Sequence, residues 1–314
     1  MSNVLLVDGY GLFIRHYSAN PTISENGYHV GGVVGFLKAL QFAIQKHFAS
    51  RVYIVWEGGG SGFRRSLLSS YKDKRRPLRM NQYYEEQIDD TYESRNRQIL
   101  TLIKLLKHTP FCQLYVPDCE ADDIIAYVCR YTHKDENKII LSSDKDYYQL
   151  LDDKTWISTT IRKKLIGRQD VKDEFGISYK NFALAKAIVG DRSDKIDGVK
   201  GAGFKTLAKR FPILADDEDV LLDQLFEYAE HNSSSKIILY RRILEGRELI
   251  ARNWKLIHLD TASLTSQQLS RTRELIENFT PKSNKFEFMR AIIECGLNRF
   301  DVDGFFFPMK TIRW

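Results

Sequence analysis

Short apolar runs alternate with longer amphipathic stretches along this chain. Four of these runs are each followed by an acidic residue: Val4–Val7, Val52–Trp56, Gln113–Val116 and Ile139–Leu141. Runs of this length, separated by stretches with helical periodicity, are typical of parallel β-strands alternating with helices. The pattern therefore predicts an α/β fold with a mostly parallel sheet.

Acidic residues gather at the ends of the four runs. They are Asp8, Glu57, Glu120, Asp122, Asp123, Asp144 and Asp146. Parallel strands bring their carboxyl ends to one edge of the sheet, where such sheets bind ligands, so we expect these carboxylates in one cleft. Unit charges about 4 Å apart repel by roughly 4 kcal/mol at an effective dielectric of ~20, which favours bound divalent cations, and all-oxygen ligands suit Mg²⁺ or Mn²⁺. The alternative is that each acid only caps the helix after its strand.

Composition limits the class of protein. At 314 residues and 43% hydrophobic content, the chain is long enough for two domains with a packed core. We find no apolar run of ~18 residues to span a membrane, and the polar start at Met1 lacks a secretory signal. The four cysteines show neither CxxC spacing nor a disulfide pattern. We therefore expect an intracellular, cytoplasmic protein with reduced cysteines.

Positive charge is concentrated in one segment, from Arg64 to Arg79. Seven basic residues against the single acid Asp73 give this segment a charge of +6, equal to that of the whole chain. The seven are Arg64, Arg65, Lys72, Lys74, Arg75, Arg76 and Arg79. A solvated helix face is one explanation. Interleaved aromatic residues such as Phe63 and Tyr71 instead favour binding of single-stranded nucleic acid, because phosphates attract the cations and bases stack on the rings.

The basic segment lies in a long connection between the second and third predicted strands, from Gly58 to about Thr109. Most connections are much shorter, so we interpret the surplus as a functional excursion. Glycines at its start free the chain to leave the sheet, and residues 64–97 are expected to form helical segments above the acidic edge. After them, an amphipathic helix is predicted to pack on the sheet through Ile99, Leu102, Ile103, Leu105 and Leu106. A phosphodiester backbone would fit between the basic segment and the acids.

A glycine-rich turn precedes a helix that starts at Phe204. Gly198, Gly201 and Gly203 would leave backbone N–H groups free to hold a phosphate, and Lys200 and Lys205 add positive charge. A structural helix–turn–helix explains the same glycines equally well. Just before this turn, Asp191 and Asp194 would extend the acidic cluster if the loop returns to the sheet edge. Alternatively, they only stabilise a turn through Asx hydrogen bonds.

Several of these motifs occur together in an order that resembles the flap endonuclease or 5′→3′ exonuclease family, and most closely phage 5′ nucleases such as the T-even ribonuclease H type. The motifs are Leu6–Gly9, the basic stretch Phe63–Arg75, Glu120–Asp123, Ser143–Asp146 and Gly190–Gly203. The resemblance implies a PIN-like α/β nuclease core with a helical arch over residues 58–98, within residues 1–188. It also implies a helix–hairpin–helix module and a helical C-terminal region in residues 189–314.

The resemblance also implies roles for individual residues. Asp8, Glu57, Asp122 and Asp144 match ligands of a first Mg²⁺ ion, and Asp146, Asp191 and Asp194 match the second. Glu120 and Asp123 match carboxylates that bridge or support these ligands. Lys72, Arg64 and Arg75 or Arg76 match cations that contact the scissile phosphate, while Arg65, Lys74, Arg79, Lys200, Gly201, Gly203 and Lys205 complete the DNA-binding set.

Two positions depart from the family pattern. Glu57 stands where relatives usually carry Asp, so the first metal ligand has an extra methylene. Asp197 and Ala202 change the hairpin, which puts K⁺ binding there in doubt.

The activity that the resemblance implies is two-metal hydrolysis of branched or nicked DNA with a 5′ flap or 5′ end, and of RNA–DNA primers. The resemblance places this activity in phage DNA replication or repair. It also suggests a replication clamp or a single-strand-binding protein as a partner. A PIN-type ribonuclease acting on single-stranded RNA would keep the acidic core without needing the arch or the hairpin. A non-catalytic structure-specific DNA-binding protein is the other alternative.

Overall fold

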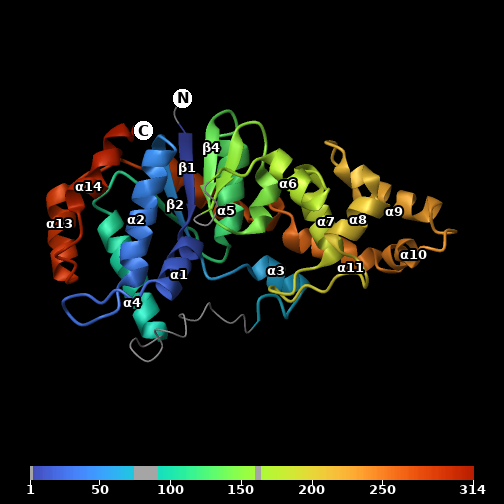
Figure 1. The fold of residues 1–314 in the computed structure, drawn as a ribbon, viewed down its shortest axis with the longest axis horizontal. Helices are drawn as coiled ribbons and strands as arrows, with labels where there is room; N and C mark the ends of the chain where they lie inside the picture. The colour runs from blue at the N-terminus through green and yellow to red at the C-terminus, as the bar shows by residue number, and fades with distance from the viewer. Residues whose placement is uncertain (1–2, 74–90, 160–163) are drawn as a thin grey trace.

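A five-stranded parallel sheet lies at the centre of the protein (Figure 1). The computed structural model describes residues 3–73, 91–159 and 164–314. The strand order is β3-β2-β1-β4-β5, and every neighbouring pair is parallel. The strands are β1 (Asn3–Asp8), β2 (Ala49–Trp56), β3 (Cys112–Tyr115), β4 (Asn137–Leu141) and β5 (Thr155–Ser158). The four predicted strands and the parallel sheet are confirmed, and β5 is an addition.

Helices cover both faces of the sheet and extend beyond its β5 side (Figure 1). The helices are α1 (Gly9–Ala19), α2 (Gly31–Lys46), α3 (Gly62–Leu67), α4 (Tyr92–Leu106), α5 (Ala121–Tyr127), α6 (Arg168–Phe175), α7 (Phe182–Val189), α8 (Phe204–Arg210), α9 (Leu222–His231), α10 (Ile238–Glu245), α11 (Arg247–Ile257), α12 (Ser266–Glu277), α13 (Lys285–Glu294) and α14 (Val302–Phe306). Within the described residues, no helix has the length and apolar character needed to cross a membrane.

The strands bury both of their faces, as their nearly continuous apolar sequences require. Leu5 and Val7 of β1 pack with α1, α2 and α4 in one core cluster. Val4 and Leu6 of the same strand pack with α5 in a second cluster on the opposite face. Successive side chains of a strand point to opposite faces, so one short run of residues supplies both cores.

The helix at residues 92–106 confirms the amphipathic helix predicted from Ile99 to Leu106. Leu102, Leu105 and Leu106 are buried against the sheet, and Ile99 and Ile103 pack beside them. The expectation of helix from Arg64 to Arg97 is only partly met. α3 ends at Leu67, and residues 69–73 form turns. Residues 74–90 lie outside the described residues.

The C-terminal segment returns to the N-terminal half of the chain, where α14 lies beside α2 and α13 packs against α4 (Figure 1). Phe288 and Phe305 are fully buried in the same core cluster as β1 and α2. The Arg313 backbone N–H donates to the Ser50 carbonyl at 2.7 Å, and the Thr311 hydroxyl donates to the Ala49 carbonyl at 3.0 Å. The division of the chain at residues 188/189 stays a prediction.

Candidate active site at the carboxyl edge of the sheet

Asp8 is the last residue of β1, and Asp144 follows the end of β4, so both lie at the carboxyl edge of the sheet. Asp8 caps α1, because its Oδ1 accepts a hydrogen bond from the Gly11 backbone N–H at 2.8 Å. Its Oδ2 accepts from the Ser142 hydroxyl at 3.0 Å. Asp144 similarly caps the short helix after β4 by accepting from the Asp146 N–H at 2.9 Å. The capping interpretation of these acids is thus correct, and it does not exclude their clustering.

Glu57 and Asp122 complete the first acidic group. Glu57 follows β2, and its Oε2 accepts a hydrogen bond from the Ala121 N–H at 3.4 Å. Asp122 lies in the first turn of α5 and accepts a hydrogen bond from the Tyr147 hydroxyl. Burial raises the pKa of Glu57 to about 7, with the negative charges of Glu120 and Asp8 adding to the effect. Burial and the charge of Asp144 raise the pKa of Asp122.

Lys72 supplies the positive charge within this group. Its ammonium lies 2.9 Å from Glu120 Oε1 and 4.0 Å from Asp194 Oδ2. Burial lowers the pKa of Lys72, but the charges of Glu120 and its neighbours outweigh burial and raise it. The same ammonium lowers the pKa values of Asp8, Glu57 and Asp122. Lys72 therefore acts as an internal counter-ion for the acids at the ends of β1 and β2 and at the start of α5.

The backbone of Lys72 is fixed in an uncommon conformation. Its φ is 51°, in the left-handed region that side chains other than glycine seldom adopt. The Lys72 N–H donates to the Asp194 carbonyl at 3.2 Å, which ties this turn to the hairpin loop. The lysine is thus positioned by a turn, and not by a helix as the sequence pattern predicted.

Arg64 is buried, with 1% of its surface exposed. Its guanidinium donates to both Asp123 oxygens at 2.6 and 2.7 Å, to Glu120 Oε2 at 3.1 Å and, through Nε, to the Leu256 carbonyl at 2.8 Å. Asp123 is also 1% exposed and accepts from the Ser263 hydroxyl at 2.7 Å. These partners leave Arg64 no access to a phosphate. Asp123 is the counter-ion of Arg64 in this structure, and contact of Arg64 with the substrate stays a prediction that this placement does not favour.

Glu120 connects this buried pair to the site. Its carboxylate binds Arg64 and Lys72 and accepts from the Tyr71 hydroxyl at 3.0 Å. Tyr71 is 6% exposed, so the structure does not present this ring for stacking on a base. Burial and the charge of Glu120 raise the pKa of Tyr71, which keeps its hydroxyl a hydrogen-bond donor. Glu120 therefore positions Lys72.

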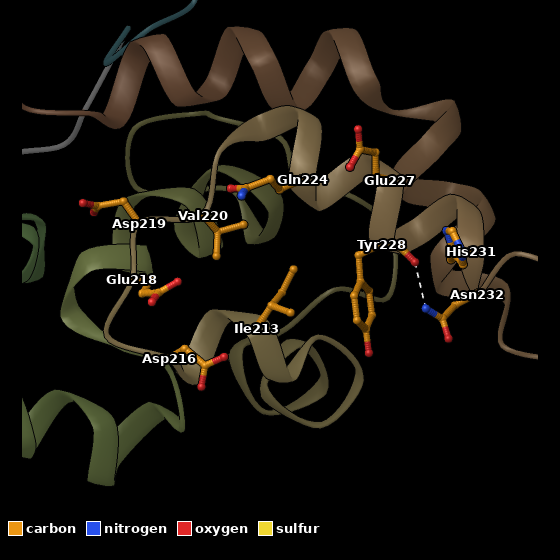
Figure 2. Close-up of a pocket in the computed structure, with 10 residues that line it drawn as sticks. All are labelled: Ile213, Asp216, Glu218, Asp219, Val220, Gln224, Glu227, Tyr228, His231 and Asn232. Carbon is orange, nitrogen blue, oxygen red and sulfur yellow. Dashed lines mark hydrogen bonds between the residues drawn. The ribbon is translucent and has the colours of Figure 1, made fainter.

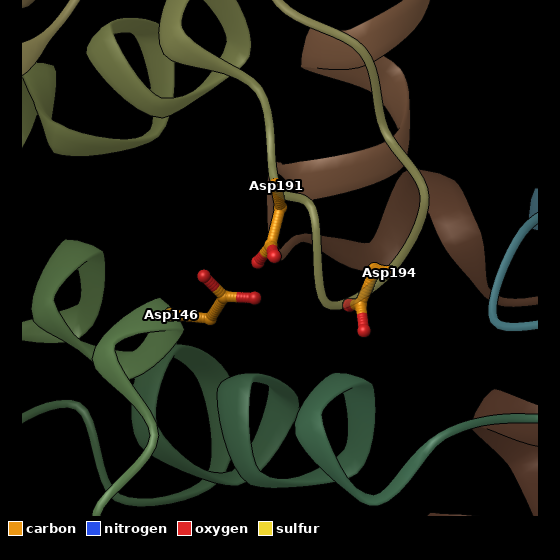
Figure 3. A group of neighbouring side chains, drawn as sticks. All are labelled: Asp146, Asp191 and Asp194. Carbon is orange, nitrogen blue, oxygen red and sulfur yellow. The ribbon is translucent and has the colours of Figure 1, made fainter. Parts of the chain in front are cut away.

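A second acidic group lies beside the first and consists of Asp146, Asp191 and Asp194 (Figure 3). One carboxylate oxygen from each lies within 4.8 Å of the others. Asp146 comes from the helical turn after β4, whereas Asp191 and Asp194 come from the loop after α7. The structure thus brings together the three residues predicted to hold a second ion.

Lys186, which the sequence analysis missed, lies between two members of this group. Its ammonium contacts Asp146 and lies 2.7 Å from Asp191 Oδ2. Burial raises the pKa of Asp146 to about 6. Burial also raises that of Asp191, but Lys186 and Ser193 outweigh it and lower the value to about 2. The available signal was that Lys186 is the one charged residue in the apolar helix FALAKAIV.

The glycine-rich turn forms the predicted hairpin between α7 and α8. Gly190 and Gly201 have φ values of 82° and 85°, which favour glycine. A Cβ on Gly198 would lie 1.9 Å from the Val189 carbonyl oxygen, whereas a Cβ on Gly203 would meet no atom within 4 Å. The fold of the hairpin therefore does not require glycine at position 203.

The remaining predicted DNA contacts divide into two groups. Arg65, Lys200 and Lys205 are exposed. Lys74, Arg75, Arg76 and Arg79 lie outside the described residues.

The fold and its acid-lined sheet edge define a nuclease-like α/β protein. A model of the 5′-3′ exonuclease N-terminal resolvase-like domain matches residues 3–176. This match covers more than half of the chain, which therefore belongs to the 5′-3′ exonuclease family. The family resemblance is thereby confirmed, while the nearness to the T-even type stays a prediction.

Curated relatives agree with this assignment. Thermostable DNA polymerase I of Thermus thermophilus is 31% identical over 208 residues, which cover 66% of this chain and 23% of that polymerase. The 5′-3′ exonuclease of Buchnera aphidicola is 28% identical over 214 residues, covering 66% of this chain and 70% of the relative. The chain thus spans about a quarter of the length of the polymerases that it matches.

Solved structures confirm the fold. The bacteriophage T5 D15 protein, crystallised with metal ions, matches with a TM-score of 0.70 and 22% identity, covering 88% of this chain and 98% of that chain. Flap endonuclease-1 of Methanococcus jannaschii matches with a TM-score of 0.50 and 13% identity, covering 98% and 90%. At these identities the likeness supports the PIN-like flap endonuclease fold.

Proposed function

We propose that this protein is a structure-specific 5′ nuclease that cleaves phosphodiesters of branched or nicked DNA and of RNA–DNA primers. The observation that carries the proposal is the meeting of two acidic groups at one sheet edge, with Lys72 contacting a carboxylate beside the first and lying near Asp194 of the second. These carboxylates would repel a polyanionic substrate unless bound cations neutralise their negative charge. Membership of the exonuclease family supports the same activity.

The donor chemistry of these residues suits two divalent ions, and Asp146, Asp191 and Asp194 also have oxygens within 4.8 Å of one another. All donors are carboxylate oxygens, as Mg²⁺ and Mn²⁺ prefer, and the pKa of Glu57 near 7 reflects a burial cost that a bound cation would relieve. The first ion would be held by Asp8, Glu57, Asp122 and Asp144, and the second by Asp146, Asp191 and Asp194. Bound ions of this kind activate water and stabilise the leaving oxygen.

The side chains of the protein perform the remaining steps. The Lys72 ammonium would neutralise charge that develops on the non-bridging phosphate oxygens. Glu120 holds Lys72 in place, Tyr147 orients Asp122 through its hydroxyl, and Ser142 orients Asp8. Lys186 holds Asp146 and Asp191 together before an ion enters.

The hairpin between α7 and α8 would bind the duplex arm of the substrate. Gly203 leaves room for a phosphate to approach the backbone, and exposed Lys200 and Lys205 lie on the same loop and helix. A K⁺ ion at the hairpin, and a clamp or single-strand-binding protein as partner, stay predictions from the family resemblance. So does the cytoplasmic location expected of an enzyme that acts on replicating DNA.

The test is cleavage of a 5′-flap duplex with Mg²⁺ by the wild-type protein and by Asp122→Asn. Loss of one ligand charge at nearly constant volume should lower cleavage at least about a hundredfold and leave flap binding largely intact. Asp173→Asn on exposed α6 is the matched control and should cleave normally. Single-stranded RNA as the preferred substrate would support the ribonuclease alternative, and flap binding without cleavage would support the non-catalytic one.

A further inference from the structure

An acidic surface lies far from the sheet edge, at the end of the molecule formed by α8, α9 and α10 (Figure 1). From Asp216 to Glu230 the chain carries seven acids and no Lys or Arg, although the whole protein has a net charge of +6. The acids are Asp216, Asp217, Glu218, Asp219, Asp223, Glu227 and Glu230. Such a surface repels the DNA backbone, so it faces away from the proposed substrate or binds something else.

This surface contains a pocket of about 510 Å³ (Figure 2). Ile213, Val220 and Tyr228 lie around its middle, with Asp216, Glu218 and Asp219 at one end, Glu227 above and His231 at the other end (Figure 2). The Tyr228 ring packs against the rings of Phe211 and Tyr240, at centroid distances of 5.3 and 6.4 Å. The pocket therefore combines an apolar, aromatic centre with a negatively charged rim.

Two buried side chains hold the acidic loop in place, and one of them is Ser178, whose hydroxyl donates to Asp217 Oδ1 at 2.9 Å. Asn181 is 1% exposed, and its amide donates to the carbonyls of Leu214, Asp216 and Glu218 at 3.4, 3.2 and 2.9 Å. Its Oδ1 accepts from the Val220 N–H at 2.9 Å. Four adjacent acids are thus ordered by backbone contacts despite their mutual repulsion, and a surface ordered in advance loses less entropy when a ligand binds.

The rim carboxylates have the chemistry of a site for an extended cation. Across the described residues, no ion pair within 4.0 Å neutralises Asp216, Glu218, Asp219 or Glu227. Among the described residues, these four do not form a group with oxygens within 4.8 Å of one another. Separated negative charges around an aromatic ring suit a guanidinium or ammonium on an aliphatic stem.

We propose that this pocket docks a basic peptide segment of a partner protein, with an Arg or Lys side chain over Tyr228 and an apolar neighbour against Ile213 and Val220. Charge complementarity selects the partner, since Asp216, Glu218, Asp219 and Glu227 line the pocket and no Lys or Arg of the described chain does. The pocket lies on the acidic surface and is separate from the acidic sheet edge, because the two share no residue. The docking is independent of catalysis.

The test is fluorescence anisotropy with a fluorescein-labelled peptide, Gly-Arg-Leu-Arg-Gly, at low salt, beside a Gly-Glu-Leu-Glu-Gly peptide. The Arg peptide should bind the wild-type protein and the Glu peptide should not. The double variant Glu218→Gln/Asp219→Asn should bind the Arg peptide about fivefold more weakly, because each exposed pair contributes about 0.5 kcal/mol. Its side chains are exposed and its backbone bonds are kept, so its melting temperature should match the wild type.

The matched control is Asp223→Asn/Glu245→Gln, which removes the same charge from exposed positions that do not line the pocket. It should bind the peptide nearly as well as wild type. Equal weakening in both double variants would show general electrostatic attraction and overturn the pocket proposal. Equal affinity for free arginine or spermidine and for the peptide would overturn it too, because the apolar centre would then contribute nothing. A third variant, Ile213→Ala, should weaken the peptide alone and leave spermidine binding unchanged.

Discussion

Single carboxylates at the sheet edge serve two structural purposes. Asp8 uses one oxygen to cap α1 and the other to accept from Ser142, and Asp144 caps the turn that carries Asp146. Helix capping fixes the direction of each carboxylate before any ion binds. A capping role of Asp8 and Asp144 is therefore compatible with the proposed role of the same residues as metal ligands.

Lys72 is expected to act in the transition state. Lys72→Met keeps the aliphatic stem and removes the ammonium, so single-turnover flap cleavage should fall about a hundredfold with a small change in binding. Lys195→Met is the control, because Lys195 lies on the neighbouring loop and pairs only loosely with Asp73 at 3.8 Å. If both variants lose only salt-dependent affinity, Lys72 is a passive surface charge.

Glu57 should make the metal-free protein less stable as pH rises. Burial raises its pKa from 4.5 to about 7, so between these values the folded state holds a proton that the unfolded state has released. Stability should thus fall from pH 4.5 to 7, and Glu57→Gln should remove on the order of 2 kcal/mol of that fall. Thermal unfolding in EDTA at pH 5 and pH 8 measures this difference.

Glu93→Gln, at an exposed position on α4, is the control for this experiment. Its pH dependence should equal that of the wild type. A Glu57→Gln variant with an unchanged pH dependence would contradict the buried, protonated state of Glu57. Added Mg²⁺ should stabilise the wild type most at high pH, where Glu57 is ionised.

The sequence predicted which acids meet, but not which basic residues stay exposed. Apolar runs predict where the strands end, and a parallel sheet places the acids after those ends along one edge. Burial of Arg64 depends on Asp123 and on the distant Leu256 carbonyl, a contact that no local pattern encodes. Lys186 was missed for the same reason, since its partners Asp146 and Asp191 lie in other segments.

At the scale of elements, the apolar runs that end before acidic residues were predicted well, whereas β5 and the strained turn after α3 were not. β5 is as short as β3, but Thr155–Ser158 has only two apolar residues and no acidic residue directly after it. The turn after α3 looked helical because its basic residues fit a solvated face, yet Lys72 adopts a positive φ to reach Glu120. Tertiary contacts overrode local propensity there.

Substitutions in the hairpin should distinguish a glycine that the fold requires from one that the proposed DNA contact requires. Gly203→Val meets no atom in the protein and has an ordinary φ of −149°, so the melting temperature should hold. Duplex affinity should fall roughly five- to tenfold, as expected for a lost backbone–phosphate hydrogen bond. Gly198→Ala places a Cβ 1.9 Å from the Val189 oxygen and should lower the melting temperature. Unchanged duplex affinity in Gly203→Val would remove the hairpin from the DNA interface.

At the scale of the whole molecule, the C-terminal helices complete the core of the N-terminal half. Phe288 and Phe305 stack at a centroid distance of 5.1 Å within the cluster that contains β1 and α2. The Trp314 indole N–H donates to the Pro110 carbonyl at 2.9 Å, next to the start of β3. The core around β1 and α2 therefore includes residues from the far end of the chain, and the Trp314 contact spans 204 positions.

Phe305→Ala should test this dependence. A fully buried Phe replaced by Ala leaves a cavity, so the free energy of unfolding should fall by about 3–5 kcal/mol. Phe307→Ala, two residues on and 63% exposed, should change it by less than about 0.5 kcal/mol. Chemical denaturation of both variants gives the comparison. Similar small losses in both would mean that the tail is only loosely attached.

The buried contacts of Arg64 also limit how this protein evolves. The guanidinium joins α3, α5 and the end of α11, and loss of either member of such a pair costs about 3–5 kcal/mol because the other charge is left without compensation. Arg64 and Asp123 are therefore epistatic: neither can drift alone, and a lineage can exchange them only by changing both together. Any recombination that separates residue 64 from residue 123 inherits the same penalty. Segments exchanged between this protein and a relative that lacks the pair must therefore carry residues 64 and 123 together.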